Sequence, residues 1–452
     1  MRRPRRQTCP TPIRGRIRVN DFFHYRGGEL CAEELPVAHI AAVVGTPFYL
    51  YSAAGFAAQY RRFADAFLAE RPLICYAVKA NSNLAVLRLL AGFGAGADVV
   101  SEGELRRALA AGVPPERIIF SGVGKAAAEM QAALDAGIHQ INVESVPELR
   151  RLSEVASAQG RIAPIAIRVN PDVDALTHAK ISTGRKENKF GIELDEAVAA
   201  FELANELPGI EPIGLAVHIG SQLTDLEPYR RAFERVAELV LELRALGFSV
   251  ARLDLGGGIG VRYHAERVLE PASYANLVRD IFGSLGLTLA FEPGRVVTAA
   301  AGLLVSQVLY VKEGSTRRFI IVDAAMNDLI RPALYDAWHH IVPVRLPAAS
   351  ASLTPADVVG PVCETGDTFA VDRELPPFAE GDLLAFTAAG AYGAVMSTTY
   401  NSRLLVPEVL VSDGRFAIIR ARPSYDALLS LDTIPEWLPD AAKEPARKRG
   451  VA

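Results

Sequence analysis

Between residues 54 and 295 the sequence alternates short β-rich runs with helical stretches, and this alternation constrains the fold more than any other feature. Eight runs are predicted as strands: Leu73–Val78, Asp98–Val100, Ile118–Phe120, Gln140–Val143, Ile162–Val169, Ile213–His218, Arg252–Leu255 and Thr288–Phe291. Helical apolar spacing covers stretches around them: 54–70, 84–92, 102–111, 126–136, 146–159, 194–206, 227–246 and 272–285. Such alternation favours a parallel sheet, and eight units predict a closed (β/α)8 barrel of the TIM type. A doubly wound open sheet is the structural alternative.

After Gly294 the pattern changes to strand-like segments without long amphipathic helices, punctuated by turn signals such as Ser-Asp-Gly at 412–414. This pattern predicts a second, mostly β domain, a barrel or a sandwich. The domains expected from the sequence are a disordered basic tail (1–20), an N-terminal segment packing with the β domain (21–50), the barrel (51–295), the β domain (296–425) and a C-terminal tail (426–452).

The formal net charge of −4 combines a basic start with an acidic remainder. Residues 1–20 hold seven arginines and no acidic residue. Removing these seven from the 48 Lys and Arg leaves 41 against 52 Asp and Glu, a formal charge of −11. Because phosphate backbones need a basic surface, this acidity argues against nucleic acid as the main partner.

Membrane and metal classes are also disfavoured. The uncharged run 296–311 is short for a membrane span, and the run 383–402 carries Gly, Thr, Ser, Tyr and Asn that indicate buried strands and turns. No secretory signal is recognisable. The four cysteines show no CxxC or zinc-like spacing, so a reduced, cytoplasmic setting is expected, with no metal site.

Functional groups of a barrel of this kind collect at the C-terminal ends of its strands. The residues at these ends are Lys79, Ser101 with Glu102, Ser121, Glu144, Arg168 with Asn170, His218, Gly256–Gly258 and Glu292. Lys79 ends an apolar strand, where desolvation would lower its pKa and make a neutral amine available. A salt-bridged lysine at a strand end is the ordinary alternative.

The glycine turn at 256–258 allows backbone N–H groups to approach a phosphate, although a simple tight turn is equally compatible with it. The usual phosphate site of such barrels lies after strands seven and eight, where this turn and Glu292–Arg295 stand. A Schiff-base lysine with a phosphate cradle indicates pyridoxal 5'-phosphate (PLP). Glu292 would then keep the pyridine nitrogen protonated, and His218 would stack on the ring, although a lone histidine there is more often a core residue.

Several ordered motifs make the resemblance specific: YAVKAN (76–81), HIGSQ (218–222), LGGGIG (255–260), EPGR (292–295), CETGD (363–367) and GAYG (390–393). They resemble the barrel-type (fold type III) PLP-dependent amino-acid decarboxylases. The stretches 178–192 and 323–335 resemble the diaminopimelate decarboxylases in particular. Together the matches run from about residue 22 to residue 420. Ser101-Glu102-Gly103 stands where many relatives have Ser-Gly-Gly, a departure that is not connected to activity.

The resemblance implies a role for each matching residue. Lys79 would carry PLP, Glu292 would pair with the pyridine nitrogen, and Cys363 would donate the proton. The cofactor site as a whole would comprise Lys79, His218, Ser221, Gly256, Gly257, Gly258, Glu292, Pro293, Gly294, Arg295 and Tyr392. Family members are homodimers with active sites at the interface, so Cys363 and Glu364 are expected to reach the partner chain's cofactor.

Substrate choice is expected to depend on the distal end of the substrate. Diaminopimelate carries a carboxylate and an ammonium there, whereas ornithine and arginine lack the carboxylate. Arg331 offers a planar fork for a carboxylate. Arg295, Tyr335 and Tyr392 would add contacts, and Glu364 would accept the distal ammonium. The expected activity is therefore decarboxylation of meso-2,6-diaminopimelate to L-lysine and carbon dioxide, the last step of lysine biosynthesis by that pathway.

The alternatives are a decarboxylase of ornithine, arginine or carboxynorspermidine, an amino-acid racemase, and a catalytically inactive relative that binds a partner protein. The presence of both Lys79 and Cys363 argues against the inactive relative.

Overall fold

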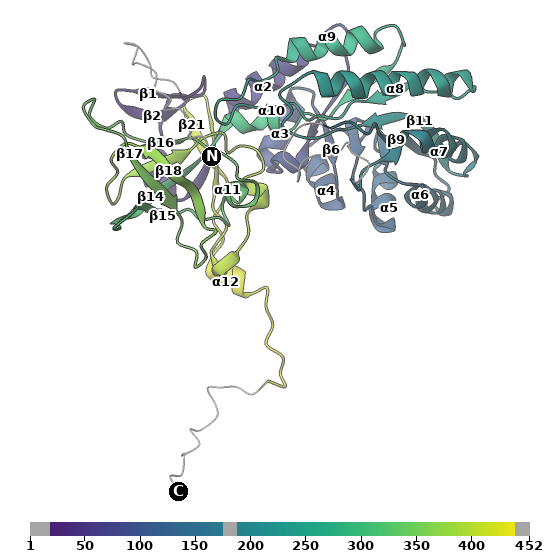
Figure 1. Cartoon of the computed structure of the whole chain (residues 1–452). Helices are drawn as coiled ribbons and strands as arrows, with labels where there is room; N and C mark the ends of the chain where they lie inside the picture. Colours follow the sequence, from purple (N-terminus) through teal and green to yellow (C-terminus); the bar gives the residue numbers. More distant parts are fainter. Residues whose placement is uncertain (1–18, 175–187, 439–452) are drawn as a thin grey trace.

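The computed structural model describes residues 19–174 and 188–438. Its larger part is a closed barrel of eight parallel strands, in which the eighth strand pairs with the first (Figure 1). In spatial order the strands are β5 (Leu73–Ala77), β6 (Gly96–Val99), β7 (Ile118–Phe120), β8 (Gln140–Val143), β9 (Ala163–Asn170), β11 (Ile210–Val217), β12 (Arg252–Asp254) and β13 (Thr288–Phe291). The predicted barrel is confirmed, and the doubly wound alternative is wrong.

Helices cover the outside of the barrel, and several begin where a side chain caps them. They are α2 (Ala53–Asp65), α3 (Leu84–Gly92), α4 (Glu102–Ala110), α5 (Ala127–Ala136), α6 (Val146–Ala158), α7 (Leu194–Glu206), α8 (Glu227–Ala245) and α9 (Pro271–Phe282). Ser52, Ser101 and Ser145 each accept a hydrogen bond from a backbone N–H in the first turn. The buried faces of the helices pack on the strands, as the apolar spacing predicts.

The second part is a mostly β domain built around the long strand β14 (Gly302–Glu313). Its sheet follows the order β18-β17-β15-β14-β4-β20-β21: β18 (Thr368–Leu375), β17 (Thr354–Val359), β15 (Arg318–Val322), β14, β4 (Phe48–Ser52), β20 (Glu408–Ser412) and β21 (Arg415–Arg420). The strands β16 (Ile341–Pro343) and β19 (Leu383–Phe386) pair beside β14. The short helices α11 (Arg331–Tyr335) and α12 (Tyr425–Leu429) belong to this domain. A further short helix, α10 (Arg295–Thr298), follows β13 and contacts α2 of the barrel.

The N-terminal segment lies against this β domain. It contains β1 (Phe23–Arg26), β2 (Glu29–Ala32), β3 (Leu35–Pro36) and α1 (Val37–Val44). Phe23 and Leu30 share one apolar cluster with Leu303 of β14. Strand β4 crosses the boundary expected at residue 50, because it pairs with both β14 and β20. The other domain limits remain predictions.

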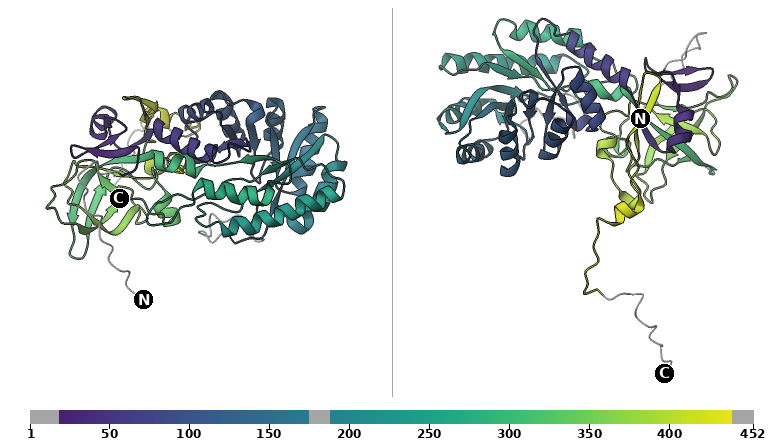
Figure 2. Two further views of the ribbon diagram at one scale, coloured as in Figure 1. Left: turned by 90° about the horizontal axis from the view of Figure 1, so that it is seen from above. Right: turned by 180° about the vertical axis from the view of Figure 1, so that it is seen from behind.

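The barrel and the β domain stand side by side (Figure 2). Phe67 and Phe291, whose ring centroids are 4.4 Å apart, belong to the aromatic cluster between the barrel and its helices. Residues 1–18 of the expected tail 1–20, residues 439–452 of the expected tail 426–452, and part of the motif at 178–192 lie outside the described residues. Within 19–174 and 188–438, no helix is both long and apolar enough to cross a membrane.

Candidate active site

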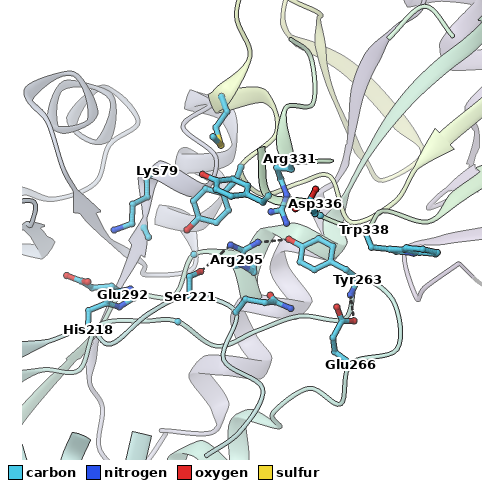
Figure 3. Close-up of a pocket in the computed structure, with 18 residues that line it drawn as sticks. Lys79, His218, Ser221, Tyr263, Glu266, Glu292, Arg295, Arg331, Asp336 and Trp338 are labelled. Atoms are coloured by element: carbon cyan, nitrogen blue, oxygen red, sulfur yellow. Dashed lines mark hydrogen bonds between the residues drawn. The ribbon is translucent and has the colours of Figure 1, made fainter. Parts of the chain in front are cut away.

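A cavity of about 430 Å³ lies where the C-terminal ends of the barrel strands meet the β domain. Figure 3 shows Lys79 and Glu292 at one end of it, Arg331 and Tyr263 at the other, and Arg295 between them. Most of the predicted site residues line it: Lys79, His218, Ser221, Gly258, Glu292, Gly294, Arg295, Arg331, Tyr335 and Tyr392. The two domains therefore build one site together.

Lys79 stands in the turn Val78–Ala80 that follows β5. Its Nζ donates a hydrogen bond of 2.8 Å to Oδ2 of Asp98, a fully buried residue of β6. Burial lowers the pKa of Lys79, but the carboxylates of Asp98 and Glu292 outweigh burial and leave that pKa above its ordinary value. The expectation of a lowered lysine pKa is therefore wrong. The carboxylate that raises this pKa belongs to Asp98 on the neighbouring strand, 19 positions along the chain, and local sequence does not show this pairing.

Glu292 follows β13 and belongs to a buried polar network. Ser121 Oγ donates to Glu292 Oε1 at 2.9 Å, and Asn142 Nδ2 donates to Asp254 Oδ2 at 2.8 Å. Asp254 also hydrogen-bonds to Glu292. Burial, followed by the charges of Asp254 and Asp98, raises the pKa of Glu292 well above its ordinary value. Two adjacent buried carboxyl groups favour a cationic partner such as a protonated pyridine nitrogen.

The glycine turn at 256–258 is required by close backbone packing. A Cβ atom at Gly257 would lie 2.3 Å from the backbone oxygen of Glu292, and one at Gly258 would lie 2.3 Å from that of Gly220. Gly258 also has a φ of +101°, which favours glycine. The turn therefore packs against the backbone of Glu292 and Gly220 more closely than a residue with a side chain would allow.

Two backbone amides of this turn donate hydrogen bonds to other residues of the protein. Gly256 N–H donates to Asp254 Oδ1 at 2.9 Å, and Gly257 N–H donates to His218 Nδ1 at 3.1 Å. Neither of these glycines lines the cavity, nor does Pro293, whereas Gly258 and Gly294 do. Burial, with Arg168 and Lys79, lowers the pKa of His218 well below its ordinary value, so the imidazole is neutral.

The cavity is cationic from its middle to the end away from Lys79. Arg295 donates to Tyr263 Oη at 2.7 Å and to Ser221 Oγ at 3.2 Å. Arg331, at the start of α11, is only 5% exposed, and burial lowers its pKa. Neither guanidinium forms an ion pair with a carboxylate of the described residues (19–174 and 188–438). A negatively charged ligand would supply the missing partner.

Tyr392 and Tyr335 complete this end from the β domain. The ring of Tyr392 lies 4.7 Å from the Arg295 guanidinium carbon, and its backbone has a φ of +55°.

Cys363 and Glu364 are placed elsewhere, on an exposed turn of the β domain. Cys363 N–H donates to Asn401 Oδ1 at 3.2 Å, and Glu364 Oε2 accepts a hydrogen bond of 3.0 Å from Tyr400. Neither residue lines the cavity of its own chain. The structure thus gathers most of the expected cofactor residues at the cavity but leaves the expected proton donor outside.

Comparison with known proteins agrees with this geometry. Residues 53–299 match the family described as "Pyridoxal-dependent decarboxylase, pyridoxal binding domain". The diaminopimelate decarboxylase of Pseudomonas aeruginosa is 51% identical over 414 residues, covering 92% of this chain and 99% of that protein. The chain belongs to the diaminopimelate decarboxylase family. The family member from Zymomonas mobilis is 48% identical over 421 residues, with the same two coverages.

Solved structures of the family share the whole fold. The crystal structure of diaminopimelate decarboxylase from Helicobacter pylori complexed with L-lysine matches with a TM-score of 0.84 and 45% identity, covering 87% of this chain and 98% of that chain. The diaminopimelate decarboxylase from M. jannaschii in complex with L-lysine matches with a TM-score of 0.87 and 36% identity, covering 92% of this chain and 98% of that chain. The predicted family membership and the PLP dependence are confirmed.

The cavity residues fit the cofactor of the family. A lysine stands at one barrel strand end, two buried carboxyl groups favour a cation, and a glycine turn with Arg295 favours an anion. Sequence reasoning missed Asp98, Asn142, Asp254 and Tyr263. Asp98 had a signal, since it is a charged residue inside the otherwise apolar strand β6. Asn142 and Asp254 share their strands with Gln140 and Arg252, and Tyr263 lies in a loop without any pattern.

Proposed function

We propose that this protein decarboxylates meso-2,6-diaminopimelate to L-lysine and carbon dioxide, as a PLP-dependent carboxy-lyase of lysine biosynthesis. The observation that carries the proposal is the pair of buried guanidinium groups of Arg295 and Arg331, which lack a carboxylate partner among the described residues. Arg331 lies at the cavity end away from Lys79, and Arg295 lies between that end and Lys79. The family relationship over nearly the whole chain supports the same reaction.

PLP supplies an electron sink for the pair of electrons that the departing carboxylate leaves behind. Lys79 would hold the cofactor covalently through Nζ, and Glu292 would keep a proton at the pyridine nitrogen. The neutral His218 would lie against the ring, held by its hydrogen bond from Gly257. Gly258, Gly294, the backbone of Arg295 and the side chains of Ser221 and Tyr392 would surround the phosphate. The N–H groups of Gly256 and Gly257 already donate hydrogen bonds within the protein, so these two amides would hold the shape of the turn and would not bind the phosphate.

Substrate selection follows from charge pairing in a buried site. Arg331, with Arg295 and Tyr335, would bind the carboxylate at the end of the substrate that does not react. Ornithine, arginine and carboxynorspermidine cannot pair with both guanidinium groups there, and an unpaired buried charge is costly. These amino acids remain the alternative substrates.

Carbon dioxide release from diaminopimelate, ornithine, arginine and L-lysine tests the substrate directly. We expect release from diaminopimelate alone, with L-lysine as product. Arg331→Leu should lose most of this activity, whereas Arg345→Leu, which removes an exposed arginine of the β domain, should retain it. Full activity of Arg331→Leu, or a preference for ornithine, would refute the proposed specificity.

The proposed assembly is a homodimer whose chains share their active sites. The support is the position of Cys363 and Glu364, the expected proton donor and ammonium ligand, on an exposed turn away from their own cavity. Mixing the inactive variants Lys79→Ala and Cys363→Ala should restore part of the activity, because a hybrid dimer contains one intact site. No recovery after subunit exchange would contradict a shared site. The cytoplasmic location remains a prediction.

A further inference from the structure

Tyr263 lies between the two arginines of the cavity, in the loop that joins β12 to α9. Its hydroxyl accepts the 2.7 Å hydrogen bond from Arg295, while the guanidinium carbon of Arg331 lies 4.6 Å from the centre of its ring. The residue is 5% exposed and lines the cavity (Figure 3). The Tyr263 side chain therefore contacts both guanidinium groups, that of Arg295 through its hydroxyl and that of Arg331 through the face of its ring.

The two guanidinium groups need such an intermediary. Like charges in a buried site repel each other more strongly than in water, and Nε of each arginine has no hydrogen-bond partner among the described residues. A guanidinium over the face of an aromatic ring is attracted by the negative face of the ring. The orientation of Arg331 thus depends on the Tyr263 ring. That of Arg295 depends on the Tyr263 hydroxyl together with Ser221 and the Tyr392 ring.

The structure also fixes Tyr263 itself. Its backbone N–H donates to Glu266 Oε2 at 3.0 Å, and its ring meets the ring of His339 edge-on, with centroids 5.4 Å apart. His339 Nδ1 lies 2.8 Å from the carbonyl oxygen of Thr387, and burial lowers the pKa of His339 to about 3. The neutral imidazole supports the ring without adding a third positive charge.

We propose that Tyr263 is a positioning residue that sets the spacing and orientation of Arg295 and Arg331, and thereby selects substrates with a second carboxylate. The inference rests on the proposed function, because it assumes that these arginines bind that carboxylate. Tyr263 acts through the two arginines and takes no part in the bond-breaking step.

Two variants separate the hydroxyl from the ring. In the PLP-loaded enzyme, Tyr263→Phe should weaken L-lysine binding about tenfold, since one hydrogen bond to a charged group is lost. Tyr263→Leu also removes the cation–π contact and should weaken it about 100-fold. Binding of cadaverine, which has the same two amines but no carboxylate, should change less than about twofold. KM for diaminopimelate should rise with the L-lysine dissociation constant, while kcat stays within about threefold.

The matched controls are Tyr310→Phe and Tyr310→Leu, which alter an exposed tyrosine of β14. Equal losses for L-lysine and cadaverine in the Tyr263 variants would mean general structural damage and would overturn the inference. Unchanged L-lysine binding in Tyr263→Phe and Tyr263→Leu, with weak binding in Arg331→Leu, would overturn it while the proposed function stands. Unchanged binding in Arg331→Leu would instead refute the carboxylate site itself.

Discussion

Replacing Glu292 by glutamine tests the electrostatics of the cofactor site, because the side chain keeps its shape but can no longer ionise. The glutamine can still accept the hydrogen bond from Ser121 and can donate one to Asp254, so the buried network stays intact. What is lost is a charge-assisted hydrogen bond to the protonated pyridine nitrogen, which contributes about 1.5–3 kcal/mol. We therefore expect kcat/KM to fall about 10- to 150-fold.

The same variant has a second, opposite consequence for the cofactor-free chain. Because the pKa of Glu292 is raised in the folded state, the carboxyl holds its proton on folding, and stability is full below the ordinary pKa of 4.5. Stability is then lost as the pH rises toward the folded pKa, by about 1.4 kcal/mol for each pH unit between the two pKa values. Cofactor-free Glu292→Gln should therefore be more stable than the cofactor-free wild type at neutral pH, with a flatter pH dependence.

The assays are steady-state decarboxylation of the PLP-loaded enzyme and thermal unfolding of the cofactor-free chain between about pH 4 and pH 8. About 2 °C or more of added Tm is expected near pH 7.5, and none near pH 4. Either of two results would show that the electrostatic reasoning is wrong. The first is activity of Glu292→Gln within about twofold of the wild type. The second is a cofactor-free wild type that gains stability relative to Glu292→Gln as the pH rises over this range.

Three further substitutions test other parts of the structure. Asp98→Asn removes the negative charge that offsets the effect of burial on Lys79, so the lysine pKa should fall. The pH midpoint of cofactor attachment, measured by visible absorbance, should then drop by about one pH unit or more. An unchanged midpoint would contradict the pairing of Asp98 with Lys79. Gly257→Ala forces a Cβ against the Glu292 carbonyl and should cost about 1–3 kcal/mol in denaturant unfolding, whereas Gly124→Ala, which has open space, should cost far less. Phe67→Ala should lose about 3–5 kcal/mol by the same measurement, and the exposed Leu68→Ala almost nothing; similar losses for both would refute the packing argument.

The barrel was predictable because its strands and helices follow local apolar periodicity, and the predicted strand Gln140–Val143 coincides with β8. Once the strands were predicted, the candidate site residues followed from them, because the C-terminal ends of barrel strands meet at one edge.

The partners of those residues were harder to predict. Asp98 faces Lys79 from the neighbouring strand, and the sequence shows burial at each position but not the pairing that reverses the lysine pKa shift. The position of Tyr263 depends on a long loop beside the cavity, and loop conformations carry no periodic signal. The contact of β4 with β14 joins segments about 250 residues apart, which no local pattern encodes.

That pairing makes the barrel an insertion within the β domain. During synthesis, Phe48–Ser52 leaves the ribosome long before its neighbours Gly302–Glu313 and Glu408–Ser412 exist, so the strand must wait while the whole barrel is made. The β domain can close only after residues 408–412, the partner of β4 that is made last, have left the ribosome. Arg331 and Tyr392 belong to this late-made part, so a truncated chain would carry the cofactor lysine without the groups that recognise the substrate.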